Sequence, residues 1–517
     1  MSLNLLDFRN ALDKYPESVL VDLSGPIPKN TTFREINIQV SALIDRLQAQ
    51  GVKAGDVVGV WLPNRGEWVC IMLALISLDC TLLAIPDEES ADNVTKCLDE
   101  YGVVLLIADK THPQVFAGHS MDIDSPEIIG QAYRIAQPLC IHVQPSPLWS
   151  FTSGSTGRPK CISARREGLE ALMSEVIADF CINSRDSLLL FLPMASYQQY
   201  FLALACIFSG ASLGIASPSR LLGALQQFHP TVLLAPPALY DSIASSFNQL
   251  PKWKQSVAIV GVTISVFLPR QWRRWVIDKV HAPIMRFFGG QIRLLFTGMA
   301  PLRGNTAHLF YRLQLPLFEV YGTTETGIVA WNKPKASRKE SVGRVLRDVT
   351  LHFDAQGEII VERSAMPTHG YVNDKENSHA SAYLSASRVQ TGDIGYIDRD
   401  GFLYLTGRSK NIIVLHTGEK LHPERVEKLI TSYPGILQAV VAQNEFEDEL
   451  AVIVVIDREE LRNSVNQHIS YVEKQLPSGC QFGIVIVTME KFTRENGLLT
   501  SNLKLNRLAL KLRFLNR

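Results

Sequence analysis

The chain has 517 residues, 46% of them hydrophobic, and its 51 lysines and arginines are balanced by 51 aspartates and glutamates. That length exceeds what one hydrophobic core normally supports, so two or more domains are expected, and the hydrophobic content excludes a largely disordered chain. A net charge of zero lacks the positive excess that non-specific binding to nucleic acid or to anionic membranes requires.

The sequence also carries signals about compartment. Its first residues have neither the basic start nor the long apolar run of an export signal. The longest apolar stretches, 69–85 and 200–216, are interrupted by polar residues or glycine, so no membrane span is expected. The eight cysteines form no C-x-x-C pair and no metal-binding spacing, which predicts reduced, mostly buried thiols in a cytoplasmic protein.

Strand-like and helix-like segments alternate through the first 330 residues. Strands are expected at 56–62, 81–85, 103–108, 187–192, 211–216, 231–235, 291–296 and 318–321, with helices such as 67–79 and 94–101 between them. This alternation predicts an α/β fold with largely parallel sheets, whose ligands bind beyond the carboxyl ends of the strands.

The pattern of expected secondary structure changes after about residue 340, where short strands and turn signals appear. The last 110 residues or so read as a separate α+β unit, joined to the rest at 407–411. Within it we expect a helix over 423–431, strands at 439–442, 450–455 and 482–488, and a second helix before the last strand. The basic and aromatic segment 270–275 (RQWRRW) is interpreted as the solvated face of an amphipathic helix, with a membrane or nucleic-acid contact as the alternative.

A glycine- and hydroxyl-rich segment, FTSGSTGRPK at 151–160, follows a probable strand. Its glycines permit tight turns, and its hydroxyls and backbone N–H groups suit a polyphosphate that Lys160 would neutralise. The spacing is not that of the P-loop, and taken alone the segment also fits an ordinary Ser/Gly-rich turn.

Two further motifs follow in order. YGTTETG at 321–327 ends a strand and supplies a ring, hydroxyls and one carboxylate, where a nucleotide and its metal ion could bind. TGD at 391–393 adds a carboxylate suited to a ribose diol, shortly before Gly407-Arg408, and TGMAP at 297–301 lies between the first motif and these. Such a series is very improbable by chance.

With these motifs the sequence resembles the adenylate-forming superfamily of acyl-CoA synthetases, peptide-synthetase adenylation domains and firefly-type luciferases. The resemblance runs from Thr32-Phe33-Arg34-Glu35 to Lys504. It implies a large N-terminal part, residues 1–408, with αβαβα sheets and a small β-barrel, a hinge at 409–411, and a small mobile α+β C-terminal domain at 412–517.

The resemblance also implies roles for individual residues. The loop expected to close over the phosphates of ATP comprises Thr152, Ser153, Gly154, Ser155, Thr156, Gly157 and Lys160. The other nucleotide contacts are expected from Gly298, Met299 and Ala300 beside adenine, Tyr321 stacked on adenine, Thr324 at the α-phosphate, and Asp393 and Arg408 at the ribose. Glu325 is expected to hold Mg²⁺, and Lys410 occupies the hinge position.

The C-terminal segment 495–507 resembles the ending of long-chain acyl-CoA synthetases, in which the catalytic lysine lies several residues after a glycine. This assigns the catalytic lysine to Lys504. The alternative is that Lys504 is simply part of a basic C-terminal helix.

The pattern departs from the family near the expected acyl end. Cys161 replaces the usual glycine, Arg165-Arg166 replaces a Thr-His pair, and Ser196 stands where histidine is common. With Ser196, the bulky Tyr197 and Tyr200 are expected to line the acyl pocket. No aspartate resembles an amino-group anchor, which disfavours an α-amino acid. A fatty or aryl-bearing acid is therefore expected.

The sequence thus predicts an AMP-forming acid–thiol ligase that uses ATP and Mg²⁺ to convert a carboxylic acid into an acyl-adenylate, and passes the acyl group to CoA. One alternative is a stand-alone enzyme that loads the phosphopantetheine of an acyl carrier protein. The other is a weakly active nucleotide-binding scaffold. No nucleic-acid partner is expected.

Overall fold

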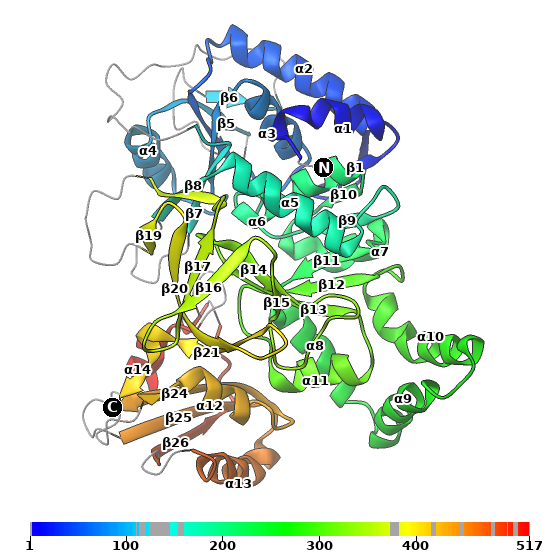
Figure 1. The fold of residues 1–517 in the computed structure, drawn as a ribbon, viewed down its shortest axis with the longest axis vertical. Coiled ribbons are helices and arrows are strands. Elements are labelled where there is room, and N and C mark those ends of the chain that lie inside the picture. Colours follow the sequence, from blue (N-terminus) through cyan, green and yellow to red (C-terminus); the bar gives the residue numbers. More distant parts are fainter. Residues whose placement is uncertain are drawn as a thin grey trace.

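The computed structural model describes residues 3–109, 111–112, 120–124, 145–152, 160–372, 382–414, 420–444, 449–476, 481–493, 495–499 and 505–515. Two large sheets and their helices form the upper part of the molecule in Figure 1, and a separate small sheet near the C-terminus lies below them. None of the helices within these residues combines the length and the apolar character that crossing a membrane needs.

The first sheet is built around parallel strands. Their hydrogen-bonded order is β13-β12-β11-β9-β10-β1, and the antiparallel edge strand β2 completes that side. The bounds are β1 Val19–Asp22, β2 Lys29–Thr32, β9 Ser187–Leu190, β10 Ser212–Ile215, β11 Val232–Ala235, β12 Leu294–Thr297 and β13 Leu317–Thr323. Five of the expected strands fall here, each shifted by no more than about three residues.

The second sheet has parallel strands in the order β6-β5-β3-β4-β7, extended by the antiparallel strands β8 and β18. The bounds are β3 Val57–Trp61, β4 Thr81–Ile85, β5 Val103–Ala108, β6 Ser120–Asp122, β7 Leu148–Thr152, β8 Lys160–Ala164 and β18 Thr368–Tyr371. Strand β18 comes from the chain more than 200 residues after β8, so this sheet joins distant parts of the sequence.

Alternate side chains on the strands divide the core into layers, because successive residues of a strand point to opposite faces. On β9, Leu188 and Leu190 join the large cluster between the two sheets, whereas Leu189 joins the cluster outside the first sheet. On β4, Leu82 lies in the central cluster and Leu83 in the cluster outside the second sheet.

Helices pack on both faces of each sheet, in the same layers as the clusters described above. The central cluster includes α3, α5 and α6, the outer face of the first sheet packs against α7, α8 and α11, and that of the second packs against α4. The bounds are α1 Phe8–Lys14, α2 Phe33–Ala49, α3 Glu67–Ser77, α4 Ala91–Glu100, α5 Arg166–Phe180, α6 Tyr197–Ser209, α7 Leu221–Phe228, α8 Pro237–Asn248 and α11 Gly304–Arg312. The expected αβαβα arrangement is confirmed.

A group of antiparallel strands continues the first sheet beyond β13, in the order β14-β15-β21-β20-β17-β16, and β19 pairs with β20. They lie in the part of the chain where a small barrel was expected. The bounds are β14 Gly327–Trp331, β15 Gly343–Val345, β16 Val349–Phe353, β17 Glu358–Arg363, β19 Tyr383–Ser385, β20 Arg388–Ile397 and β21 Phe402–Arg408.

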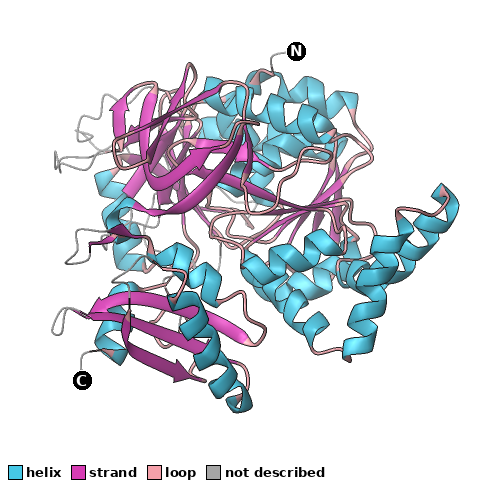
Figure 2. Ribbon diagram, turned by 60° about the horizontal axis from the view of Figure 1, so that its bottom comes forward, coloured by secondary structure: helices cyan, strands magenta, loops and turns pink. Residues whose placement is uncertain are grey.

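The chain after Arg408 forms its own sheet and its own hydrophobic clusters. The order is β24-β25-β26 (Figure 2), and β22 and β23 form a separate two-stranded pair. The bounds are β22 Ile413–Val414, β23 Lys420–Leu421, α12 Pro423–Ile430, β24 Ile436–Asn444, β25 Glu449–Ile456, α13 Arg462–Glu473, β26 Phe482–Thr488 and α14 Arg507–Phe514. The expected order of helices and strands is the one observed.

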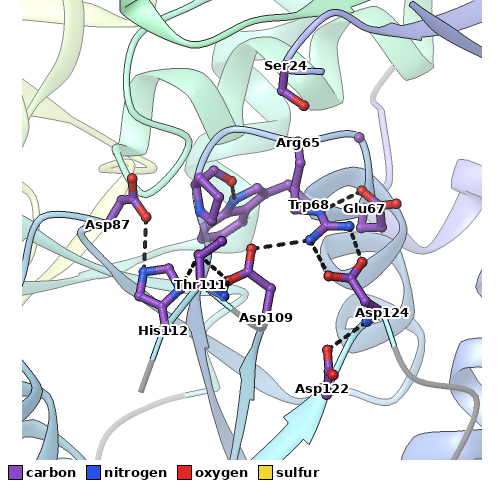
Figure 3. Close-up of polar contacts among 12 residues, drawn as sticks. Ser24, Arg65, Glu67, Trp68, Asp87, Asp109, Thr111, His112, Asp122 and Asp124 are labelled. Carbon is purple, nitrogen blue, oxygen red and sulfur yellow. Dashed lines mark hydrogen bonds and ion pairs between the residues drawn. The ribbon is translucent and has the colours of Figure 1, made fainter. Parts of the chain in front are cut away.

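An ion-pair network closes the carboxyl edge of the second sheet (Figure 3). The Arg65 guanidinium lies 2.9 Å from Glu67, 3.3 Å from Asp109 and 2.5 Å from Asp124, and its side chain is 16% exposed. Burial would raise the pKa of Asp109, but hydrogen bonds from Thr111 and His112 lower it below its usual value. These contacts hold the ends of β3, β5 and β6 together.

The described cysteines are unpaired thiols: Cys70, Cys80, Cys97, Cys161, Cys181 and Cys206. Burial raises the pKa of Cys70 and of Cys80 to about 12, so neither is a ready nucleophile. Cys181, at the left-handed position that ends α5, is exposed, whereas most of the other described cysteines are buried, as expected.

Candidate functional site

The end of β12 approaches the neighbouring strand closely. A Cβ on Gly298 would lie 2.8 Å from the Val320 carbonyl oxygen of β13, so only glycine fits without displacing the backbone. The next residue, Met299, has φ +69°, a left-handed conformation that is unfavourable for a residue with a side chain. Gly298, Met299 and Ala300 are half-buried and form a constrained ledge beside β13.

Tyr321, Asp393 and Arg408 form one connected network. The Tyr321 hydroxyl donates a 3.0 Å hydrogen bond to Asp393 Oδ2, and Arg408 Nε lies 2.9 Å from Asp393 Oδ1. Burial, together with the Asp393 carboxylate, raises the pKa of Tyr321 well above its usual value, so the hydroxyl keeps the proton that it donates. Three residues that the sequence assigned to nucleotide binding are therefore brought together from β13, β20 and β21.

A tight turn follows β13. Thr326 and Thr323 hydrogen-bond to each other through side chain and backbone, and Thr324 lies half-buried between them in sequence. Beneath the turn, the Arg363 side chain is 1% exposed, donates to the Thr326 carbonyl at 2.8 Å and pairs with Asp348 at 2.9 Å. This buried guanidinium fixes the backbone that presents Thr324 and Glu325.

Glu325 and Lys160 are joined by Tyr371, a residue that the motifs did not reveal. The Tyr371 hydroxyl donates a 2.6 Å hydrogen bond to Glu325 Oε1, and Lys160 Nζ lies 4.8 Å from the centre of the same ring. The Glu325 backbone carbonyl accepts a second hydrogen bond, 2.6 Å long, from Thr368 on β18. One tyrosine thus contacts a carboxylate through its hydroxyl and an ammonium through its ring.

Lys160 also marks the base of the glycine- and hydroxyl-rich segment. Thr152 at the end of β7 pairs with Lys160 at the start of β8, and its hydroxyl donates to the Lys160 carbonyl at 3.2 Å. Ser153, Gly154, Ser155, Thr156 and Gly157, between these two residues, lie outside the described residues, as does Lys504.

Lys410 lies two residues beyond Arg408 in a short 3-10 helix, Ser409–Asn411, at the junction with the C-terminal sheet. Burial and the neighbouring Arg408 guanidinium lower its pKa. The Ser409 hydroxyl donates to the Gly392 carbonyl at 3.3 Å, so the chain is fastened to β20 immediately before Lys410.

Ser196, Tyr197 and Tyr200 occur at the start of α6, in the central layer. Ser196 Oγ, the Tyr197 hydroxyl and the Gln199 side-chain oxygen are buried and have no hydrogen-bond partner among the described residues. The Tyr200 hydroxyl instead donates to the Pro147 carbonyl at 3.3 Å. Burial raises the pKa of both tyrosines, so both hydroxyls stay protonated.

These arrangements were compared with known proteins. A family model described as AMP-binding enzyme matches residues 8–365. The chain belongs to the AMP-binding enzyme family. The resemblance to adenylate-forming enzymes that the motifs indicated is therefore confirmed.

Individual relatives agree with this family. The long-chain-fatty-acid–CoA ligase FadD15 of Mycobacterium bovis is 26% identical over 83% of this chain and 78% of its own length. A 4-chlorobenzoate–CoA ligase of Arthrobacter is 25% identical over 79% of this chain and 77% of its own length. The solved structure of O-succinylbenzoate–CoA synthetase from Bacillus subtilis in complex with AMP covers 98% of both chains with a TM-score of 0.73 and 19% identity, a similarity of fold.

The buried Arg363 generates a prediction about stability. Arg363→Met should lower the free energy of unfolding by about 3 kcal/mol, because it leaves Asp348 without its partner and the Thr326 carbonyl without a donor. Arg347→Met is the matched control. Arg347 is 84% exposed and lies 3.6 Å from Asp179, and such an exposed ion pair contributes little to stability. Urea unfolding measures both; equal losses would show that Arg363 does not support the turn.

Proposed function

We propose that this protein uses ATP to convert a fatty or aryl-bearing carboxylic acid into an acyl-adenylate, with release of pyrophosphate, and then transfers the acyl group to the thiol of CoA. Membership of the AMP-binding family supports the first step. The observation that carries the proposal is the continuity of the site. Tyr321 lies on β13, which leads directly into the Thr324-Glu325 turn, and its hydroxyl is connected through Asp393 on β20 to Arg408 on β21.

The connected network suits the nucleoside half of ATP. Asp393 and Arg408 would hold the ribose hydroxyls, because a carboxylate accepts two such bonds and its orientation is already set by Tyr321 and Arg408. The Tyr321 ring would stack on adenine beside the Gly298–Ala300 ledge. Thr152, the segment that follows it and Lys160 would hold the β- and γ-phosphates, and Thr324 the α-phosphate.

The residues present fit a magnesium ion bound with ATP. Mg²⁺ usually takes one or two carboxylates, substrate phosphates and water rather than a cluster of protein ligands, and Glu325 supplies one such carboxylate. When bound, the ion would neutralise phosphate charge. The Tyr371 hydroxyl would orient Glu325 towards it.

The chemistry is limited by repulsion between the attacking carboxylate and the α-phosphate of ATP. Lys504 would offset that repulsion and stabilise charge that develops on the α-phosphoryl oxygens in the transition state. Lys160 would stabilise the departing pyrophosphate. The thiolate of CoA would then attack the acyl carbon and displace AMP.

Two catalytic steps at one site require a rearrangement between them. We place the hinge at 409–411, between an N-terminal part at 1–408 and a mobile C-terminal domain at 412–517. Rotation at Lys410 would withdraw Lys504 after adenylation and admit the thiol.

The identity of the acid depends on the surroundings of α6. Three buried polar atoms, on Ser196, Tyr197 and Gln199, have no hydrogen-bond partner within the described part of the chain, and such atoms are costly unless a ligand satisfies them. They favour an acid that carries an oxygen or an aromatic ring beyond its carboxylate. The free thiols of the described cysteines fit the cytoplasm, which we propose as the compartment.

The function is tested by acid-dependent exchange of pyrophosphate into ATP, with decanoate, palmitate, benzoate, acetate and leucine in competition. Decanoate, palmitate or benzoate should support exchange, and acetate and leucine should not. Lys504→Ala is the control and should lose about a hundredfold in rate. CoA and a panel of holo acyl carrier proteins then compete as acceptors. No exchange with any acid would favour a nucleotide-binding scaffold, and preference for a carrier protein would favour a loading enzyme.

Tyr371→Phe tests how Glu325 is positioned. This variant keeps the ring beneath Lys160 but removes the hydrogen bond to Glu325, so adenylation should slow about tenfold and half-saturation by Mg²⁺ should rise. Tyr396→Phe, an exposed tyrosine on β20, should change neither. An unaltered Mg²⁺ dependence in Tyr371→Phe would remove Tyr371 from this role.

Lys410→Pro should separate the two half-reactions. Proline fixes φ and would restrict the backbone rotation that the second step needs. Pyrophosphate exchange should persist while thioester formation is lost, whereas Lys410→Ala, which keeps φ free, should retain thioester formation. If a folded Lys410→Pro protein loses both activities equally, the hinge lies elsewhere.

A further inference from the structure

Two helices inserted in the crossover between β11 and β12 carry an unusual exposed surface. They are α9, Lys252–Ser265, and α10, Arg270–Phe287. We call residues 252–287 the hairpin. It projects from the side of the first sheet in both views, and the turn between its helices lies far from the sheets (Figures 1 and 2).

Apolar side chains form a stripe on the solvent side of α9. Trp253, Val257, Val260 and Ile264 recur at helical spacing and are each at least 50% exposed. In most amphipathic helices such a stripe faces the core. Here the buried residues of α9 are only Val262 and Ser265, so the stripe is left in solvent.

The stripe continues into the turn and the start of α10. The turn presents Val266, Phe267 and Leu268, and Phe267 is 87% exposed, the highest value among the large exposed hydrophobic residues of the described chain. Trp272 and Trp275, one helical turn apart, are 63% and 58% exposed. Tryptophan is the side chain that most favours the boundary between lipid and water.

Basic residues accompany this apolar surface. The hairpin contains Lys252, Lys254, Arg270, Arg273, Arg274, Lys279 and Arg286, against the single acidic residue Asp278. The net charge of the whole chain is zero, but the hairpin by itself is strongly positive. The earlier exclusion of anionic membranes from net charge does not hold for this segment, because the potential at a surface depends on local charge.

Other occupants fit this surface less well. A second copy of the chain would bring two strongly positive hairpins together, which repel each other. Nucleic acid would match the charge and the tryptophans, but it offers nothing apolar to cover Val257, Val260 and Ile264. An anionic bilayer offers both a negative surface and an apolar interior directly beneath it.

We propose that the hairpin docks the protein on the surface of an anionic lipid bilayer. Phe267 and its neighbours in the turn enter the acyl region, the tryptophans lie at the boundary, and the arginines contact lipid phosphates. Because the charged side chains along α10 must stay in contact with water or lipid phosphates, both helices remain at the surface of the bilayer and do not cross it. This docking does not depend on the proposed reaction.

Flotation of the full chain with vesicles tests the proposal. Vesicles of phosphatidylcholine with about 30% phosphatidylglycerol should bind the protein, and vesicles of phosphatidylcholine alone should bind it much more weakly. Phe267→Glu should weaken binding to the anionic vesicles about tenfold, because it places a charge where apolar burial is needed. Ile38→Glu is the control, since Ile38 is 66% exposed on α2, outside the hairpin, and should bind like the unmodified protein.

The electrostatic part has its own variant. Arg270→Gln with Arg274→Gln should lower affinity about tenfold at low salt and reduce the loss of binding that added salt causes. The Arg274 side chain is 86% exposed and lies 3.9 Å from Asp278, so the fold should be unaffected, which circular dichroism checks.

Two outcomes would overturn the proposal. One is the absence of binding to either vesicle by the unmodified protein; binding to duplex DNA, or self-association in sedimentation, that Phe267→Glu abolishes would then identify the actual occupant. The other is equal weakening by Phe267→Glu and Ile38→Glu. Because pyrophosphate exchange is measured without vesicles, failure of docking would leave the proposed reaction untouched.

Discussion

The buried hydrogen bond between the Tyr321 hydroxyl and the Asp393 carboxylate is the contact on which the arrangement of the site depends. It connects the last parallel strand of the first sheet to the antiparallel strands that follow, and Asp393 passes the connection on to Arg408. In the sheet, β14, β15 and β21 lie between β13 and β20, so this bond is a direct contact between two strands that are not neighbours. Since the Thr324-Glu325 turn continues from β13, the same bond helps to fix where this turn lies relative to Arg408.

Backbone packing imposes the second constraint. The backbone at Gly298 can approach the Val320 carbonyl of β13 because glycine has no side chain. The next residue, Met299, takes a left-handed conformation. A strained residue at the end of a strand costs free energy that other contacts must offset. The buried bonds that Tyr321 makes from β13 and that Arg363 makes to Thr326, just after β13, are contacts of this kind on the neighbouring strand.

Much of this could be predicted from the sequence, and the reason is local. The parallel strands are short apolar runs, and Gly298 lies beside β13 because β12 and β13 are neighbouring parallel strands whose carboxyl ends share an edge. Asp393 and Arg408 lie on the antiparallel strands β20 and β21, and the resemblance to a family, not this geometry, assigned them to the same site. Tyr371 and Arg363 could not be found this way, because their positions follow from antiparallel pairings such as β18 with β8, which bring distant segments together. For the hairpin the sequence left two interpretations of residues 270–275 open, a solvated amphipathic face and a membrane or nucleic-acid contact, because composition does not show which side of a helix is covered. The packing shows that the apolar side of α9 is the uncovered one.

The C-terminal contacts explain how one bond rotation could act on both steps of the proposed reaction. Glu424 on α12 accepts hydrogen bonds from Asn411, next to Lys410, and from Arg507, three residues after Lys504. Arg507 also pairs with the buried Glu427 at 2.8 Å. The segments flanking the proposed hinge and the proposed catalytic lysine are therefore fastened to the same helix. A change of backbone angle at Lys410 would move them as one body, while the Asp393–Arg408 pair, which precedes the proposed hinge, would stay with the part of the chain to which we assign the nucleotide.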